Sequence, residues 1–283
     1  GVTAVINASA AGVIEVCREN KSKIGKLYAG LNGIVGALRE ELIDTSFESD
    51  DAISQLLHTP GGAFGSCRYK LKKYEDDVTE YERLIKVFRA HNIGYFFYNG
   101  GGDSADTCLK VSQISEKMGY PIRAIHIPKT IDNDLPFTDY CPGFGSVAKY
   151  VATSVREASL DIESMCASST KVFILEVMGR HAGWIAASGG LAASKKGEAP
   201  HIILFPEIPF YREAFIERIE TTVRQKGYCV IVASEGIRYS DGAHISGSMQ
   251  RDAFGHQQLG GVAPTLASIC LLYTSDAADE LRS

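Results

Sequence analysis

Buried-strand patterns that alternate with amphipathic helix patterns constrain the fold of this chain more than any other feature. Short runs rich in β-branched and aromatic residues predict strands at 93–98, 122–127, 171–177, 202–205 and 229–233. Apolar residues that recur at helical spacing predict helices at 79–92, 106–118, 185–193 and 210–226. The alternation predicts parallel α/β sheets with helices on both faces, and such sheets bind ligands at the carboxyl ends of their strands.

Composition narrows the class of protein. The 283 residues are 45% apolar and 22% charged, which is typical of a globular chain with one large or two modest domains. The net charge of −5, without a basic stripe, argues against nucleic acid as a partner. No apolar run has membrane-spanning length, and the seven cysteines include no CxxC pair. We therefore expect a reducing, cytoplasmic location.

A glycine-rich segment at 98–106 follows the first of the expected strands and precedes a helix. Its three glycines let the backbone come close to a ligand, and the N-terminus of the helix offers free N–H groups to an anion. Asp103 could hold or orient a metal bound to phosphate, or it could cap the helix. The alternative is a tight strand-to-helix turn without a ligand, and the residues alone leave both interpretations open.

A second polar segment, Pro128–Asp134, follows the next expected strand. Asp132 could act as general base towards a hydroxyl nucleophile, with Asp134 as a metal ligand. Lys129 could neutralise phosphate oxygens as charge shifts in the transition state. The alternative is a solvated Asp-Asn-Asp turn.

Three further segments carry weaker signals. Arg180, at the end of the strand 171–177, suits a planar anion. Beside it, His181 is expected to be a buried, hydrogen-bonded core residue and Trp184 a packing residue. Glu235 follows the strand 229–233 and could accept hydrogen bonds from a sugar hydroxyl.

Six segments, taken in order, resemble the phosphofructokinase family: GGAFGSCR (61–68), GGGDS (100–104), PKTIDND (128–134), MGRHAGW (178–184), SEG (234–236) and GHQQLGG (255–261). The resemblance runs over nearly all of residues 1–270, as in a fragment of a family member. It implies an α/β fold with two Rossmann-like parallel-sheet domains. Residues 1–141 with about 250–270 would bind the phosphate donor, and residues 142–249 the sugar phosphate. Residues 271–283 leave the preceding pattern, so we expect them not to belong to the fold.

The resemblance also implies an activity, phosphoryl transfer to the 1-hydroxyl of fructose 6-phosphate with Mg²⁺. The catalytic positions are Asp132, as general base, with Lys129 and Asp103. The substrate-binding positions are Thr130, Ile131, Met178, Gly179, Arg180, Glu235, His256 and Lys171. The donor-binding positions are Gly1, Arg68, Gly101, Gly102 and Ser104. The metal ligands are Asp103 and Asp134, while Gly102 stands where many relatives have a metal-binding acid. Lys171 matches a basic residue that reaches a neighbouring subunit, which implies a homo-oligomer, a dimer or a tetramer.

Two positions bear on the phosphoryl donor. Members that use ATP resemble GGDGS and PGTIDND, with glycines where this chain has Asp103 and Lys129. An Asp would obstruct the α-phosphate of ATP and a Lys would contact the terminal phosphates, so the resemblance is to pyrophosphate-dependent members. The alternatives are an ATP-dependent phosphofructokinase and a non-catalytic sugar-phosphate-binding subunit. The second is disfavoured because Asp132 and Asp134 are both present.

Overall fold

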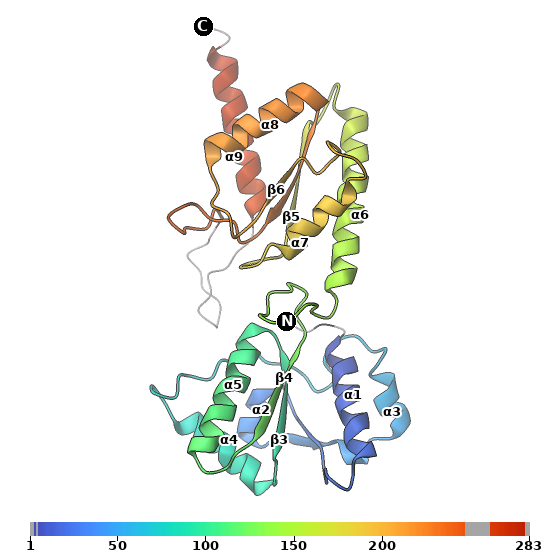
Figure 1. The fold of residues 1–283 in the computed structure, drawn as a ribbon, viewed down its shortest axis with the longest axis vertical. Helices are drawn as coiled ribbons and strands as arrows, with labels where there is room; N and C mark the ends of the chain where they lie inside the picture. The colour runs from blue at the N-terminus through green and yellow to red at the C-terminus, as the bar shows by residue number, and fades with distance from the viewer. Residues whose placement is uncertain (1–2, 4, 247–260, 281–283) are drawn as a thin grey trace. The chain divides into compact units, whose positions relative to one another are not determined.

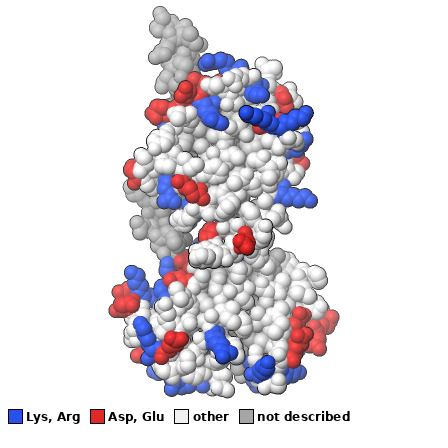
Figure 2. Space-filling model, viewed as in Figure 1, with Lys and Arg blue, Asp and Glu red and all other residues white. Residues whose placement is uncertain are grey.

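The computed structural model describes residue 3 and residues 5–246 and 261–280, without the side chains beyond Leu271. The chain forms two compact units, Gly1–Thr130 and Ile131–Ser283, and each is described by itself. No helix within the described residues combines the length and apolar character needed to cross a membrane. Figure 2 shows acidic and basic side chains mixed over the visible face of each unit.

The first unit contains these elements in chain order: α1 (Val5–Glu19), β1 (Tyr28–Gly30), α2 (Ile34–Arg39), β2 (Leu42–Asp44), the 3₁₀ turn η1 (Thr45–Phe47), α3 (Asp50–Gln55), α4 (Thr79–Ala90), β3 (Tyr95–Gly100), α5 (Gly102–Lys117) and β4 (Arg123–Pro128). Strands β3 and β4 pair in parallel, whereas β1 and β2 form a separate antiparallel pair. Helices α4 and α5 lie on one side of β3 and β4, and α1 and α3 lie on the other (Figure 1).

The core of the first unit lies under helices α4 and α5. Tyr81, Leu84, Ile85 and Phe88 share one stripe of α4, and each is at most 4% exposed. They pack against Val111 and other apolar residues of α5 and of the loops. The stripe follows the helical spacing seen in the sequence, so this helix forms where the pattern predicts it.

The second unit contains these elements: α6 (Phe144–Met165), β5 (Val172–Val177), α7 (Trp184–Ser188), the 3₁₀ turn η2 (Gly189–Ala192), β6 (Ile202–Leu204), α8 (Arg212–Lys226), β7 (Cys229–Ser234) and α9 (Val262–Glu280). The three strands form one parallel sheet in the order β5-β7-β6. In Figure 1, α6 and α7 lie on one side of this sheet, and α8 and α9 lie on the other.

The central strand β7 is buried along its whole length. Val230 and Val232 pack into the cluster that α6 and α7 form on one face. Ile231 and Ala233 pack into the cluster of α8 and α9 on the opposite face. A strand covered on both faces needs apolar residues at every position, which explains its continuous hydrophobic run. The predicted α/β class with parallel sheets is therefore confirmed.

Several boundaries differ from the sequence-based expectation. The two compact units divide after Thr130, and Ile131 already packs against the α6 and α7 cluster of the second unit. Helix α9 packs its first turns into the α8 face of the second unit. The same helix runs through residues 271–280, which were expected to lie outside the fold. The helix expected at 185–193 is α7 followed by η2.

Candidate active site

The glycine turn of the first unit lies where strands β3 and β4 end side by side. Gly100, the last residue of β3, is the register partner of Pro128, the last residue of β4. The backbone N–H of Lys129 donates to the carbonyl oxygen of Gly100 at 3.2 Å. Lys129 and Gly100, 29 residues apart in sequence, are thus brought together at one sheet edge. This is the edge at which parallel α/β sheets bind their ligands.

The three glycines of this turn differ in what the fold requires of them. A Cβ on Gly100 would lie 2.0 Å from Ser104 Oγ and 2.4 Å from Ser104 Cβ, so packing requires glycine there. A Cβ on Gly101 or Gly102 would meet nothing within 4 Å among the described atoms. Helix α5 begins at Gly102, and its first N–H groups have no intrahelical partner. Open space in front of a helix N-terminus suits an anion such as phosphate.

Asp103 lies in the first turn of α5 and forms an ion pair with Lys70, with Oδ1 and Nζ 3.1 Å apart. Arg68, two residues before Lys70, is exposed, so a cation-bearing segment runs beside this turn. Behind the turn, burial raises the pKa of Tyr98 to about 12, against the opposing effect of a hydrogen bond with Ser104. Tyr98 therefore stays neutral at physiological pH.

His126 supports the same turn from β4. Its Nε2 atom lies 3.1 Å from the carbonyl oxygen of Gly100. Burial lowers the pKa of His126, although contacts with the Gly100 and Gly101 backbone act in the opposite direction. A neutral ring that donates from Nε2 fits this arrangement.

The turn that carries Asp132 and Asp134 lies at the start of the second unit, and hydrogen bonds of the Asn133 side chain connect its two ends. Asn133 has φ 56° and is 9% exposed. Its Oδ1 accepts from the N–H of Cys141 at 2.8 Å, and its Nδ2 donates to the carbonyl of Asp139 at 3.3 Å. An Asn with its side chain bonded to a loop backbone tolerates the left-handed conformation.

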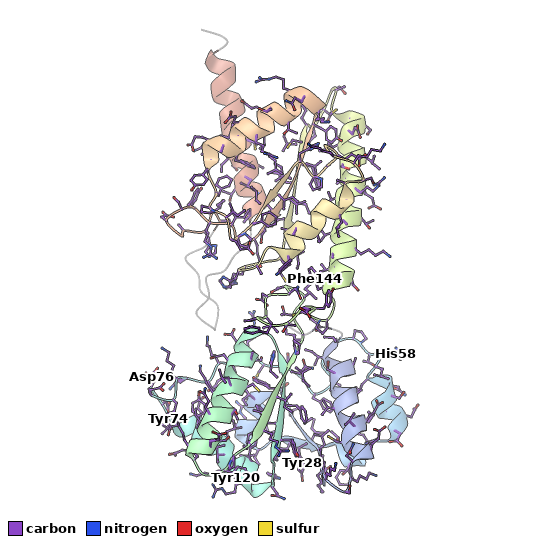
Figure 3. All side chains as sticks on the ribbon, in the orientation of Figure 1. Tyr28, His58, Tyr74, Asp76, Tyr120 and Phe144 are labelled. Atoms are coloured by element: carbon purple, nitrogen blue, oxygen red, sulfur yellow. The ribbon has the colours of Figure 1, made fainter. Side chains whose placement is uncertain are left out.

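The side chain of Ile131 packs against the α6 and α7 cluster, as does Phe144 at the start of α6 (Figure 3). The turn from Ile131 to Cys141 is thus anchored at both ends. Asp132 and Asp134 flank the buried Asn133 amide, and Asp134 is exposed.

The loop after β5 is bound to the end of β7. Val177 and Ser234 are register partners, so Met178 and Glu235 follow two strands that end together. The Ser234 hydroxyl donates to the carbonyl oxygen of Gly179, and a Glu235 carboxylate oxygen accepts from the Gly179 N–H at 3.3 Å. The predicted sugar-binding residues Met178, Gly179 and Glu235 therefore share one edge of the sheet.

Two expectations about this loop are wrong. His181, expected in the core, is exposed, and Trp184, expected to pack, is 56% exposed. His181 lies in the turn between β5 and α7 and Trp184 is the first residue of α7, while Gly183 between them takes the buried position. A Cβ on Gly183 would lie 2.6 Å from Phe205 Cδ1, so the turn packs its backbone, not these side chains, against the unit.

The structure does not bring every predicted residue to these edges. Lys171 precedes β5, at the opposite end of that strand from Met178. Six residues of strand separate them, or roughly 20 Å. Thr130 is half-buried at the last position of the first unit. Gly1 and His256 lie outside the described residues.

Asp103 and Asp134 were predicted as metal ligands. Among the described residues no group of three or more His, Cys, Asp or Glu side chains is placed to hold a metal ion. Mg²⁺ takes one or two carboxylates and fills its remaining positions with phosphate oxygens and water, so it needs no such group. Each of these carboxylates is of the chemistry that suits Mg²⁺ as a ligand beside phosphate oxygens and water.

Sequence reasoning missed four residues that support these loops. Lys70 and His126 contact the glycine turn, and Ser234 contacts the loop after β5. Glu207 accepts from the N–H of Gly183 at 2.8 Å. The signals available were local ones: His126 lies in an expected strand, and Ser234 is the first residue of the SEG segment, for which only Glu235 was given a role.

Two parallel sheets with glycine-rich and polar loops at the carboxyl ends of their strands define an α/β protein of the kind that binds ligands at that edge. A family model described as phosphofructokinase matches residues 1–274. The chain therefore belongs to the phosphofructokinase family.

Among similar proteins, the pyrophosphate–fructose 6-phosphate 1-phosphotransferase of Halomonas elongata is 71% identical over 269 residues, 95% of this chain and 64% of the relative. That of Methylococcus capsulatus is 66% identical over the same shares. The crystal structure of a pyrophosphate-dependent phosphofructokinase from Marinobacter aquaeolei matches with a TM-score of 0.78 at 66% identity, covering 95% of this chain and 62% of that one. The chain thus spans just under two thirds of the length of these relatives.

Proposed function

We propose that the protein containing this chain transfers a phosphoryl group from pyrophosphate to the 1-hydroxyl of fructose 6-phosphate, reversibly giving fructose 1,6-bisphosphate in glycolysis. The observation that carries the proposal is the position of Asp103 and of the Lys129 backbone at one glycine turn, where β3 and β4 end side by side. The names of the relatives that are 66–71% identical support the same donor and acceptor.

The donor-binding groups of the proposal come from the first unit. Pyrophosphate would bind at the start of α5, where Gly101 and Gly102 leave open space, with Ser104 in the first turn. Arg68 and Lys129 would supply positive charge to its oxygens. The carboxylate of Asp103 would occupy room that the α-phosphate of ATP needs, and that exclusion gives the preference for pyrophosphate.

The acceptor-binding groups come from the second unit. Met178, Gly179, Arg180 and Glu235 would hold the sugar phosphate, together with His256. Asp132 would accept the proton of the attacking hydroxyl, as the general base of the reaction. Phosphoryl transfer depends mainly on positioning and charge stabilisation, so anchored loops are the feature this chemistry requires.

The remaining parts of the proposal concern the metal, Thr130, Ile131 and assembly. Mg²⁺, when bound, neutralises charge on the phosphate oxygens, and Asp103 and Asp134 would be its protein ligands. Thr130 and Ile131 would contact the substrate through their backbone or, for Thr130, its hydroxyl. Lys171 would serve the site of a second copy in a homo-oligomer, since it lies far along β5 from Met178.

The test is a coupled assay of fructose 1,6-bisphosphate formation by the intact protein with each donor in turn. We expect turnover with pyrophosphate and none with ATP, and a reverse reaction with inorganic phosphate. Calorimetry with fructose 6-phosphate beside the assay separates an enzyme from a binding subunit. Robust turnover with ATP would refute the roles given to Asp103 and Lys129, and sugar-phosphate binding without turnover would refute catalysis.

A further inference from the structure

Lys70 is a cation beside the glycine turn that joins β3 to α5. It belongs to none of the six segments that resemble the family. Its Nζ lies 3.1 Å from Asp103 Oδ1, and the two side chains are 38% and 37% exposed. The ion pair joins two parts of the chain that are 33 residues apart. It connects the segment that carries Arg68 to the first turn of α5.

The backbone around Lys70 is fixed by its neighbours. Leu71 is 2% exposed and belongs to the core cluster of the first unit. The Tyr81 hydroxyl donates to the carbonyl oxygen of Lys72 at 2.6 Å, and the Tyr69 hydroxyl bonds to Glu80. The segment is thus bound to α4 on both sides of Lys70. A lysine on such a backbone loses less freedom when it forms an ion pair than one on a mobile loop does.

The negative charge of Asp103 would oppose the binding of a phosphate donor at the start of α5. A carboxylate in the first turn of α5 repels a polyanion that binds at the same helix N-terminus. Its negative charge therefore weakens the binding of any phosphate donor, whether or not its bulk excludes ATP. A cation on the carboxylate reduces that repulsion.

We infer that Lys70 is a positioning residue of the donor site, which neutralises Asp103 so that pyrophosphate can bind beside it. The inference rests on the proposed function. Lys70 acts through Asp103 and not as a direct ligand of the donor. The pair thus lets the site keep the bulk of an acidic side chain without the electrostatic repulsion it would otherwise cause.

The experiment is isothermal calorimetry of the intact protein with inorganic pyrophosphate in EDTA, so that no metal contributes. Lys70→Met is expected to weaken binding about tenfold at low ionic strength, and less at high salt. In the Asp103→Asn background, the same Lys70→Met change is expected to have an effect below about threefold, because the repelling charge is gone. Lys72→Met is the matched control, since Lys72 pairs with Asp77 at 2.9 Å and is 64% exposed.

A second measurement is the pyrophosphate KM and kcat with Mg²⁺ present. Lys70→Met should raise KM and leave kcat within about twofold, and Lys72→Met should change neither. Equal tenfold losses in both backgrounds, or no loss in either, would overturn the inference while leaving the proposed function intact. If the wild-type protein itself does not bind pyrophosphate, the proposed donor fails and the inference fails with it.

Discussion

Replacing Gly236 with alanine tests how the loop after β5 is held. A Cβ at Gly236 would lie 2.1 Å from the carbonyl oxygen of Arg180 and 2.6 Å from that of Gly179. Both neighbours are backbone atoms, so no side-chain rotation can relieve the overlap. The Arg180 carbonyl would have to move about 0.9 Å to reach 3.0 Å, below which such contacts are essentially not found.

The energetic cost follows from these contacts. Overpacking of a buried site costs about 1–3 kcal/mol, and Gly236 is buried. Moving the loop would also strain the hydrogen bonds of Gly179 to Ser234 and Glu235, each worth about 1 kcal/mol net. At about 2–4 °C per kcal/mol for a chain of this size, Gly236→Ala should lower Tm by roughly 5–10 °C.

The functional cost should be larger than the loss of stability suggests. A misplacement of about 1 Å can cost about 100-fold in a positioned reaction. We therefore expect Gly236→Ala to reduce kcat/KM for fructose 6-phosphate at least tenfold, measured well below the new Tm.

Gly145→Ala is the matched control for Gly236→Ala. Gly145 lies in α6 of the same unit, and a Cβ there meets nothing within 4 Å among the described atoms. Alanine favours a helix, so this variant should leave Tm unchanged or raise it. If Gly236→Ala matches wild type in both Tm and fructose 6-phosphate kinetics, the close approach of the two loops does not exist in the protein.

Three further predictions concern the base, the donor turn and acid stability. Asp132→Ser should lower kcat about 100- to 10,000-fold with little change in fructose 6-phosphate affinity. The control Asp139→Ser, in the same turn, should leave kcat unchanged. If Asp132→Ser keeps near-wild-type activity, Asp132 is not the base. Gly102→Ala should keep the wild-type Tm, because its Cβ meets no described atom. It should weaken pyrophosphate binding, measured by calorimetry, because the added methyl group occupies the open space at the start of α5. Unchanged binding would contradict the proposal that pyrophosphate binds at the glycine turn. Burial lowers the pKa of His126 and His201 in the folded protein, so as pH falls below about 6.5 the unfolded chain binds more protons than the folded one. The free energy of unfolding, measured by urea titration, should therefore decrease from pH 7.5 to pH 5.5. A constant value would contradict the buried, neutral state of these two histidines.

The strands were the most predictable part of the fold. All five expected strands are present, each within about two residues of its predicted bounds, because strands covered by helices on both faces need unbroken apolar runs. The long helix α6 was missed, although Val151, Val155 and Ile162 line its buried face. Valine and isoleucine favour strands, so these residues obscure a helical stripe that their spacing supports.

The positions of the site loops after the strands were predictable, but which of their residues are buried was not. A polar, glycine-rich segment after a buried strand predicts a ligand edge, and the turns at β3, β4, β5 and β7 lie at such edges. Burial within a turn depends on tertiary contacts that no local pattern records. Trp184 was therefore expected to pack, whereas Gly183 beside it is the residue enclosed by Phe205 and Glu207.

The structure distinguishes glycines that packing requires from glycines that it does not, which the sequence alone cannot do. All of them look alike in the motifs, yet the fold demands Gly100 and Gly236, whose missing Cβ atoms would overlap Ser104 and the Arg180 backbone. Gly101 and Gly102 are demanded by no described contact, and neither has a left-handed φ. Because α5 begins at Gly102, the missing side chains leave its first N–H groups open to a phosphate, as the proposal for this turn requires. That residue-by-residue distinction, more than the motif as a whole, is why we assign the phosphate donor to this turn.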